Sequence, residues 1–311
     1  MSDPITVLPI ARGSGDYLRA LHDVLEVPFT PEGPIDARVD DLLAAAAEGV
    51  ARIDLLFGAF QGGRLLAPVL AVESNGGAAL VLAPSHQIDA RMRTGTEMAL
   101  ARLRQTAFLQ GTEMLQAVVP PEADGLQGAL KAVGFRCLTT LIYLACRTGD
   151  LPTLASCRQD LTWMSYRPEI EDLFLEALER SYIDTLDCPE LVGLRSTRNA
   201  LSGHRSRRGF DPQHWWVALR GSEPVGVVLL GTIGLEPGLE IVYLGVSPES
   251  RGRGVVDALM LRTAEVARSS GVKYVTLAVD ERNVPARKMY ERFNYRGTLK
   301  RQAWIATPDG I

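Results

Sequence analysis

Short apolar runs separated by glycine-containing turns dominate the first half of the chain. The segments LLFGAF (55–60), LLAPVLAVE (65–73) and AALVLAP (78–84) are joined by QGGR and SNGG. Runs of this length between such turns predict an antiparallel meander. Helical spacing of apolar residues predicts helices elsewhere, and further apolar runs predict two later strands. The expected helices cover 15–25, 36–47, 95–110 and 125–133, and the later strands cover 112–120 and 137–146.

The second half repeats this order of elements. Gly111 and Gly134 are 23 residues apart, and so are Gly271 and Asn294. Asn is second only to Gly at a left-handed helix end, so both pairs carry the same signal. The expected elements are a hairpin beginning in 220–233, a strand over 239–246, a helix after Gly254, a strand over 272–280, a helix over 285–293 and a strand over 301–306.

Two copies of one unit about 160 residues apart predict an α+β protein with tandem domains. We place the boundary near 147–160, which gives a domain over 1–150 and a second over 160–311. Each domain is expected to be a mixed, mostly antiparallel sheet flanked by helices.

Composition excludes several classes of protein. The 311 residues have room for two cores, and contents of 46% hydrophobic and 23% charged residues are ordinary for a globular protein. A net charge of −4 gives no overall attraction to nucleic acid or to an anionic membrane. Without a basic, apolar leader or a long apolar window, the sequence indicates a cytoplasmic protein. The four cysteines and four histidines lack CxxC and HxxxH spacing, so we expect no metal and no disulfide scaffold.

The run LEIVYLGVSPESRGRGVVDALMLRTAEVA (239–267) carries most of the functional information. A strand, a glycine-bearing loop and a helix follow one another, so several backbone N–H groups point from a helix N-terminus toward a ligand. Such a site suits a phosphate or diphosphate. The spacing is neither that of a P-loop nor GxGxxG, because Asp257 stands where the third glycine would be.

This run resembles the acetyl-CoA loop of the GNAT superfamily of N-acetyltransferases, [RQ]xxGx[GA] after a strand that ends in VxP. Arg251 and Gly254 match, whereas Val256 departs from the small residue of the pattern. A branched side chain there would narrow the approach to the diphosphate. The resemblance implies cofactor contacts from the loop and from the preceding strand end. These residues are Leu244, Gly245, Val246, Arg251, Gly252, Arg253, Gly254, Val255 and Val256.

A second motif lies in VDERNVPARKMYERFNY (279–295). It resembles NxPAxxxYxxxG[FY], in which the asparagine contacts the cofactor and the tyrosine protonates the thiolate of CoA. The matching residues are Asn283, Pro285, Ala286, Tyr290 and Tyr295. By resemblance Asn283 and Ala286 bind the cofactor and Tyr290 is the general acid. From its helical spacing alone Tyr290 is a core tyrosine.

Glu240 opens the EIVYLGV strand, where some GNAT members carry the general base that deprotonates the acceptor amine. The resemblance makes Glu240 the candidate base, and a solvated carboxylate at a strand end is the alternative. Leu244 to Val246 are expected, by resemblance only, to face the pantetheine arm and the thioester oxygen where this strand splays from its neighbour.

The first copy lacks these features. Its loop after residue 85 reads HQIDARMR, without glycine, and Leu130 and Ala123 stand 160 residues before Tyr290 and Asn283. We expect this domain to be scaffold, interface or a wall of the acceptor pocket, and not a catalyst.

The acceptor side is expected from 169–216. Cys188 could accept an acyl group, but a loop cysteine without chemistry is the simpler interpretation. Arginines in this stretch could meet an acidic acceptor or the 3′-phosphate, although a solvated helix face is the alternative. One of Trp215 and Trp216 is expected in the core. The arginines are Arg195, Arg198, Arg205, Arg207 and Arg208.

These features predict an acetyl-CoA-dependent N-acetyltransferase that acetylates a primary amine, with acetyl-CoA as donor substrate. A small-molecule acceptor is expected, with neither nucleic acid nor membrane as partner. The alternatives are a protein N-terminal or lysine acetyltransferase and a non-catalytic acyl-CoA sensor. The oligomeric state and the identity of the acceptor stay open.

Overall fold

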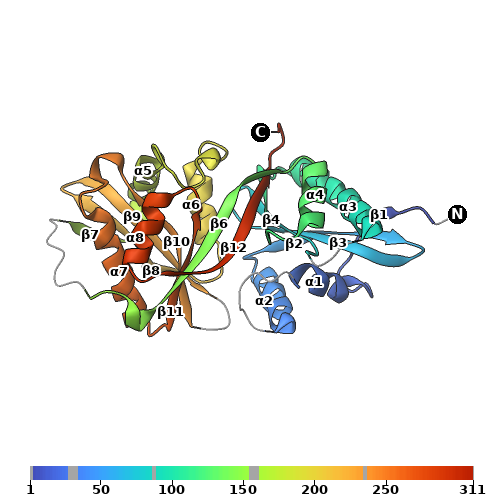
Figure 1. The fold of residues 1–311 in the computed structure, drawn as a ribbon, viewed down its shortest axis with the longest axis horizontal. Helices are drawn as coiled ribbons and strands as arrows, with labels where there is room; N and C mark the ends of the chain where they lie inside the picture. The colour runs from blue at the N-terminus through green and yellow to red at the C-terminus, as the bar shows by residue number, and fades with distance from the viewer. Residues whose placement is uncertain (1–2, 27–33, 86–88, 154–160, 234–236, 311) are drawn as a thin grey trace. The chain divides into compact units, whose positions relative to one another are not determined.

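Two units, each with its own hydrophobic core, make up the chain (Figure 1). The computed structural model describes residues 3–26, 34–85, 89–153, 161–233 and 237–310. One unit comprises Met1–Thr140 with Lys300–Ile311, and the other comprises Leu141–Leu299.

The first unit is a mixed sheet with helices on both faces. Strands β1 to β4 pair antiparallel in chain order, β4 pairs parallel with β5, and the end of β12 pairs antiparallel with β5. The strands are β1 (Thr6–Pro9), β2 (Arg52–Gln61), β3 (Arg64–Glu73), β4 (Ala78–Leu82), β5 (Met114–Val119) and β12 (Arg296–Ala306). The helices are α1 (Tyr17–Leu25), α2 (Ile35–Ala47), α3 (Ala90–Leu109) and α4 (Asp124–Ala132). Helices α3 and α4 pack on one core cluster, and α1 and α2 pack on the other.

The second unit repeats this plan. From β7 its sheet runs β7, β8, β9, β10, β11 and the end of β6, and among these pairs of described strands β10–β11 alone is parallel. The strands are β6 (Arg136–Arg147), β7 (Thr162–Ser165), β8 (Phe210–Arg220), β9 (Glu223–Ile233), β10 (Gly238–Val246) and β11 (Tyr274–Asp280). The helices are α5 (Glu171–Tyr182), α6 (Thr197–Arg205), α7 (Val255–Ser269) and α8 (Val284–Arg292), with short 3₁₀ turns η1 (Thr148–Asp150), η2 (Pro168–Ile170), η3 (Pro189–Leu191) and η4 (Pro248–Ser250).

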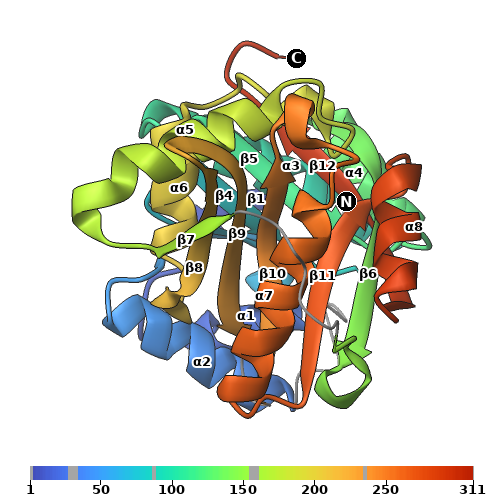
Figure 2. The same cartoon turned by 90° about the vertical axis from the view of Figure 1, so that its left-hand side faces the viewer.

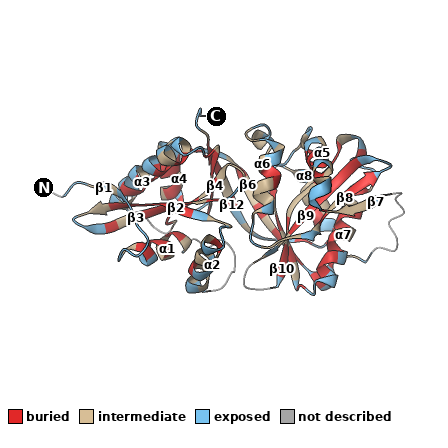
Figure 3. Cartoon of the chain, turned by 180° about the vertical axis from the view of Figure 1, so that it is seen from behind, coloured by how far each residue is buried: buried red, intermediate tan, exposed pale blue. Residues whose placement is uncertain are grey.

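Alternation along β9 shows how both faces of this sheet are covered. Val228 and Leu230 belong to the cluster under α7 and α8, whereas Val227 and Leu229 belong to the cluster under α5 and α6. Successive side chains of a strand point to opposite faces, so an almost continuous apolar run is required here. Figure 2 shows α7 lying along one face of this sheet, and Figure 3 shows buried residues on β8 and β9, whereas the short β7 has none.

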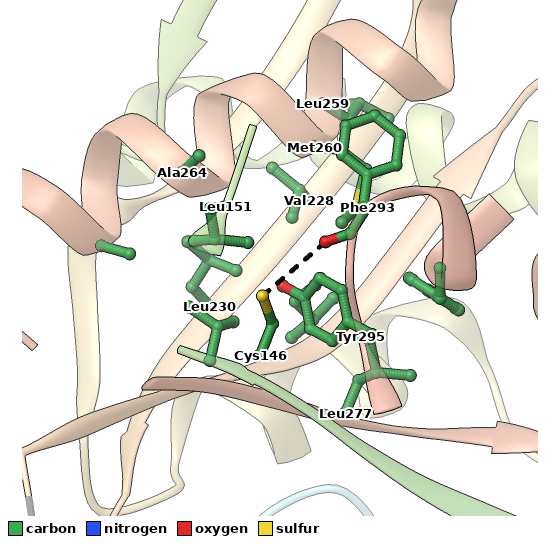
Figure 4. Close-up of a cluster of buried hydrophobic side chains, with 14 of the residues drawn as sticks. Cys146, Leu151, Val228, Leu230, Leu259, Met260, Ala264, Leu277, Phe293 and Tyr295 are labelled. Atoms are coloured by element: carbon green, nitrogen blue, oxygen red, sulfur yellow. Dashed lines mark hydrogen bonds between the residues drawn. The ribbon is translucent and has the colours of Figure 1, made fainter. Parts of the chain in front are cut away.

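The hydrophobic cluster under α7 also includes residues from the end of β6 and from the segment that follows it. Leu151 and Cys146 lie beside Phe293 and Tyr295 there, and the Cys146 thiol donates to the carbonyl of Phe293 at 3.7 Å (Figure 4). Burial raises the pKa of the Cys146 thiol, which suits a packing role and not a reactive one. The residues around 141–151 are thus part of the second core.

The last strand of each predicted domain belongs to the sheet of the other unit, so the units do not have the predicted boundaries at residues 150 and 160. Residues 141–147 pair with β11 in the second unit, and residues 302–306 pair with β5 in the first. Both segments are apolar antiparallel strands suited to the same edge, so pattern alone assigned each to its own half of the chain. The physical units therefore differ from the predicted 1–150 and 160–311.

The α+β class and the tandem arrangement are confirmed, with local differences. Helix α3 begins at Ala90 and not near 95, because the Asp89 side chain caps it by accepting from the Met92 N–H at 2.7 Å. Strands β1 and β7, of four residues each, were not predicted. Trp215 is the core member of its pair, 1% exposed. No helix in the described segments has the length and apolar character needed to cross a membrane.

Candidate active site

Strands β10 and β11 pair over three residues and then separate. Gly238 to Glu240 lie opposite Tyr274 to Thr276, after which β10 continues against β9 only and β11 against β6 only. A register shift between Ile241 and Tyr243 bends β10 at this point. The edge of β10 from residue 241 to 246 therefore has no partner in β11, which leaves strand backbone available to an extended ligand.

The loop between β10 and α7 presents unpartnered donors. Gly252 and Gly254 have φ of 71° and 79°, a left-handed backbone that glycine adopts without strain. In the described part of the chain, the N–H groups of Gly252, Gly254, Val255 and Val256 make no hydrogen bond. Gly254 is the N-cap of α7 and provides no side-chain cap. These donors at the positive end of a 15-residue helix fit a diphosphate.

The charges around this helix N-terminus also permit an anion. Asp257 in the first turn of α7 is paired with Arg292, so its negative charge is largely compensated. Val256 is partly buried against the core cluster under α7. The residues of the loop therefore fit the diphosphate of CoA, with Val256 as the bulkier neighbour that the sequence indicates.

Arg251 binds protein groups with its side chain. Its guanidinium donates to the carbonyls of Val246, Ser181 and Asp184 at 3.2 Å each and to that of Ile183 at 2.6 Å. Its backbone N–H donates to the carbonyl of Pro248. Cofactor binding by Arg251 stays a prediction that these hydrogen bonds do not favour.

Gly245 has a packing role in addition to its predicted place beside the cofactor. A Cβ there would lie 2.5 Å from the Ser181 hydroxyl oxygen and 2.8 Å from the Tyr243 ring. The absent side chain lets the end of α5 pack directly on β10. Its neighbours Leu244 and Val246 belong to the opposite, α7-covered face.

Asn283 and Ala286 form the N-terminus of α8. The Asn283 side-chain oxygen accepts from the Ala286 N–H at 3.2 Å, which caps the helix. Tyr290 follows on the buried face, 7% exposed, with its ring centroid 5.7 Å from that of Tyr295. The Tyr290 hydroxyl makes no hydrogen bond to any described residue. Burial raises the pKa of Tyr290, and the charge of Asp187 raises it further, so the phenol stays protonated.

Glu240 occupies the last position at which β10 and β11 still pair. Its side chain is 25% exposed, and its carboxylate accepts from the Arg207 guanidinium at 2.8 Å. The ion pair holds this carboxylate in place. It can take a proton only if the acceptor amine or a water molecule reaches its remaining lone pairs.

The segment 183–196, which we call the acceptor loop, is attached to the end of β11. The Asp280 N–H donates to Asp187 at 2.9 Å, and the Cys188 N–H donates to the Asp280 carboxylate at 3.1 Å. Arg282 bridges Asp280 and Glu190, with its nitrogens 2.7 and 2.6 Å from the two carboxylates. The Asp280 side chain is fully buried. Sequence reasoning missed this cluster; an aspartate ending the apolar strand YVTLAVD was the available signal.

Two side chains of the acceptor loop have altered acidity. Burial, with the charges of Asp187 and Asp280, raises the pKa of Cys188, so its thiolate is scarce and an acyl-accepting role is not supported. Part of Asp187 reaches solvent, yet the protein around its carboxylate raises its pKa, opposed by hydrogen bonds from the Asp280 N–H and Asn283. Asp187 is therefore a second carboxylate near Tyr290.

The basic residues of this region form ion pairs within the protein. Arg198 and Arg205 both bind Glu171, at 2.6 and 2.8 Å, and Arg205 also donates to the Tyr166 hydroxyl at 2.8 Å. Arg207 binds Glu240. Three of the five arginines thus form ion pairs that join α6 and its flanks to neighbouring elements, while their side chains remain 42–61% exposed.

The first unit has the same strand register but different chemistry. Residues 78–80 pair with 114–116, each 160 positions before its counterpart in the second unit. The Asp89 carboxylate caps α3, where a phosphate would be repelled. A cavity of about 10 Å³, room for one water, lies at the separation of the strands. Its lining is Val81, Leu82, Ala83, Ala117, Val118, Val119, Leu126 and Leu130. Residues 86–88 of the HQIDARMR loop lie outside the described residues.

Comparisons with known proteins match the second unit to one family. The acetyltransferase (GNAT) family model matches residues 175–295. A mycothiol acetyltransferase of Salinispora tropica is 28% identical over 250 residues, 68% of this chain and 79% of that protein. Another mycothiol acetyltransferase, from Acidothermus cellulolyticus, is 36% identical over 83 residues, 26% of this chain but only 25% of that protein.

The solved structures agree in fold. A tandem GNAT protein from the clavulanic acid biosynthesis pathway superposes with a TM-score of 0.60 at 16% identity, covering 98% of each chain. Residues 175–295, which lie within the second unit, therefore form an acetyltransferase domain of the GNAT family. The chain as a whole has the fold of a tandem GNAT protein.

Proposed function

We propose that the second unit transfers an acetyl group from acetyl-CoA to a primary amine of a small molecule by direct attack. The observation that carries the proposal is the set of N–H groups of Gly252, Gly254, Val255 and Val256, which have no partner among the described residues, beside the separated edge of β10. These donors suit a diphosphate followed by an extended pantetheine arm. Acetyl-CoA supplies the activated acetyl thioester when it is bound.

The residues divide the remaining chemistry among them. Glu240 accepts the proton that the amine loses as the C–N bond forms. Backbone N–H groups of residues 244–246 donate hydrogen bonds to the carbonyl oxygen of the acetyl thioester. Tyr290 gives its proton to the thiolate as the C–S bond breaks. Its raised pKa keeps that proton available at any assay pH. Asn283 and Ala286 are assigned to the cofactor side of the same cleft.

A small acceptor is favoured over a peptide because the acceptor loop is attached to both strand ends. Asp280 holds the loop to β11, and Arg251 joins its start to β10. A protein substrate would need an open groove at this place. The likeness to two mycothiol acetyltransferases supports an amine of that general kind, as does the tandem plan. The first unit is proposed to be non-catalytic, since Asp89 and Leu130 stand where the second unit has Gly254 and Tyr290. A cytoplasmic location stays a prediction.

The test combines binding and turnover. Titration calorimetry with CoA is expected to show one site per chain, and thiol release from acetyl-CoA with a library of amines is expected to identify acceptors. Tyr290→Phe should lower kcat by about 10²-fold or more while leaving the Kd of CoA unchanged. Tyr295→Phe is the matched control, because it removes the same atom from a neighbouring buried tyrosine whose hydroxyl has no partner among the residues that the structure describes.

Each rival has its own outcome. CoA binding without turnover on any amine would indicate a sensor, and turnover on peptides alone would indicate a protein acetyltransferase. For the base, Glu240→Gln should remove the acidic limb of the pH dependence of kcat/KM. If that limb survives in Glu240→Gln but disappears in Asp187→Asn, the base is Asp187.

A further inference from the structure

We propose that Arg251 is a positioning residue that couples occupation of the diphosphate loop to the order of the acceptor loop. This inference rests on CoA binding by the second unit as proposed above. It assigns Arg251 a role through other residues and not through contact with the phosphates.

The hydrogen bonds of Arg251 join two segments that lie about 70 residues apart in sequence. One acceptor, the carbonyl of Val246, is at the end of β10, beside the diphosphate loop. The other three, the carbonyls of Ser181, Ile183 and Asp184, lie at the end of α5 and the start of the acceptor loop. Helix-end carbonyls lack partners of their own, so a cation with several donors satisfies them together.

The position of Arg251 in the chain makes this contact sensitive to the cofactor. It directly precedes Gly252, whose N–H is among the unpartnered donors, and its own N–H closes the short turn η4. Neither Gly252 nor Gly254 carries a side chain that would restrain this loop. A diphosphate bound by the loop N–H groups would fix the backbone that carries Arg251, and the guanidinium would then fix residues 181–184.

The far end of the contact has a separate anchor. Beyond Asp184 the acceptor loop is held to β11 by the bonds of Asp187 and Cys188 with Asp280. Arg251 therefore holds the first part of the loop. This part follows Tyr182, whose ring packs edge to face on that of Tyr243 with the ring centroids 5.6 Å apart. Ordering of this part by CoA predicts that the acceptor binds more tightly after the donor than before it.

Hydrogen exchange with and without saturating CoA tests the coupling without knowledge of the acceptor. In the wild-type chain, CoA is expected to slow amide exchange at least fivefold in the peptide covering 181–187. In Arg251→Gln the Kd of CoA should stay within threefold, whereas the slowing in this peptide should fall below twofold. Arg253→Gln, which removes a charge from the same loop, should retain the slowing at saturating CoA.

Arg251→Lys provides a second variant if the glutamine variant folds poorly. A lysine ammonium lacks the planar fork that reaches several carbonyls, so an intermediate slowing is expected with CoA affinity preserved. Wild-type CoA binding with no change at 181–187, or the same change in wild type and Arg251→Gln, would overturn the coupling and leave the proposed function intact. A tenfold loss of CoA affinity with the slowing preserved would make Arg251 a phosphate ligand and also overturn it. No CoA binding by the wild type would instead refute the proposed function.

Discussion

Asp280→Asn tests whether the buried carboxylate at the end of β11 holds the acceptor loop in place. The side chain is fully buried and accepts from the N–H of Cys188 at 3.1 Å, the N–H of Arg282 at 2.8 Å and the guanidinium of Arg282 at 2.7 Å. Asparagine has the same size but only one accepting oxygen, so its amino group must face one of these donors.

The cost follows from the exposure of the two partners. Removing one partner of a fully buried ion pair costs about 3–5 kcal/mol, but Arg282 is 47% exposed and keeps Glu190, which lowers the cost. With hydrogen bonds to a charged group at about 1.5–3 kcal/mol each, we expect a loss of about 3 kcal/mol. For a unit of this size that corresponds to a Tm about 6–12 °C lower.

Calorimetric melts measure the global effect, and hydrogen exchange at the Cys188 amide measures the local one. Glu190→Gln is the control, because it removes the outer carboxylate of the same cluster, which is 31% exposed, and should cost less than about 1 kcal/mol. If Asp280→Asn melts within 1 °C of wild type, or if both variants lose the same stability, the loop is not held by the buried carboxylate.

Three further outcomes are expected. Val256→Ala should tighten CoA binding by about two- to fivefold in calorimetry because it removes a branched side chain beside the diphosphate donors; unchanged or weaker binding would contradict this. Cys188 should be alkylated by iodoacetamide at pH 8 more slowly than the exposed Cys137, as measured by peptide mass spectrometry, because burial raises the pKa of Cys188; equal rates would count against it. Burial and the charges of Arg207 and Arg195 lower the pKa of His204 to about 3. His204 is therefore neutral in the folded protein at pH values below 6.5 at which it binds a proton in the unfolded chain. Stability is then lost as pH falls below 6.5, by at most about 2 kcal/mol at pH 5, and His204→Gln should show a flatter decline in thermal melts at pH 5 to 7.

The order of elements could be predicted from the sequence because the apolar runs and turns are regular. The repeat was visible in the spacing of Gly111, Gly134, Gly271 and Asn294, and the last is left-handed with φ of 66°. The four-residue strands β1 and β7 were missed, because each carries too few apolar positions to show a period. Their place is decided by pairing with a long neighbour, which is a tertiary effect.

The site was predictable where one segment supplies all of its parts. The loop after β10 and the start of α7 are contiguous, so the donors at residues 252 and 254–256 could be located from spacing alone. The bonds of Arg251, Asp280 and Glu240 join segments far apart in sequence. A single sequence does not reveal such pairings, and the side-chain roles that depend on them emerged only in three dimensions.

Because residues 141–147 pair with β11 and residues 302–306 pair with β5, the sheet of each unit includes a strand from the other half of the sequence. A nascent chain that has emerged only to residue 299 lacks the β-strand that pairs with β5, so the first unit can complete its sheet only after residues 302–306 have been made. A fragment starting at residue 160 would lack β6 and leave β11 with an open edge prone to association. A deletion that removes the first half of the chain must therefore stop before residue 141 if the second unit is to keep its complete sheet.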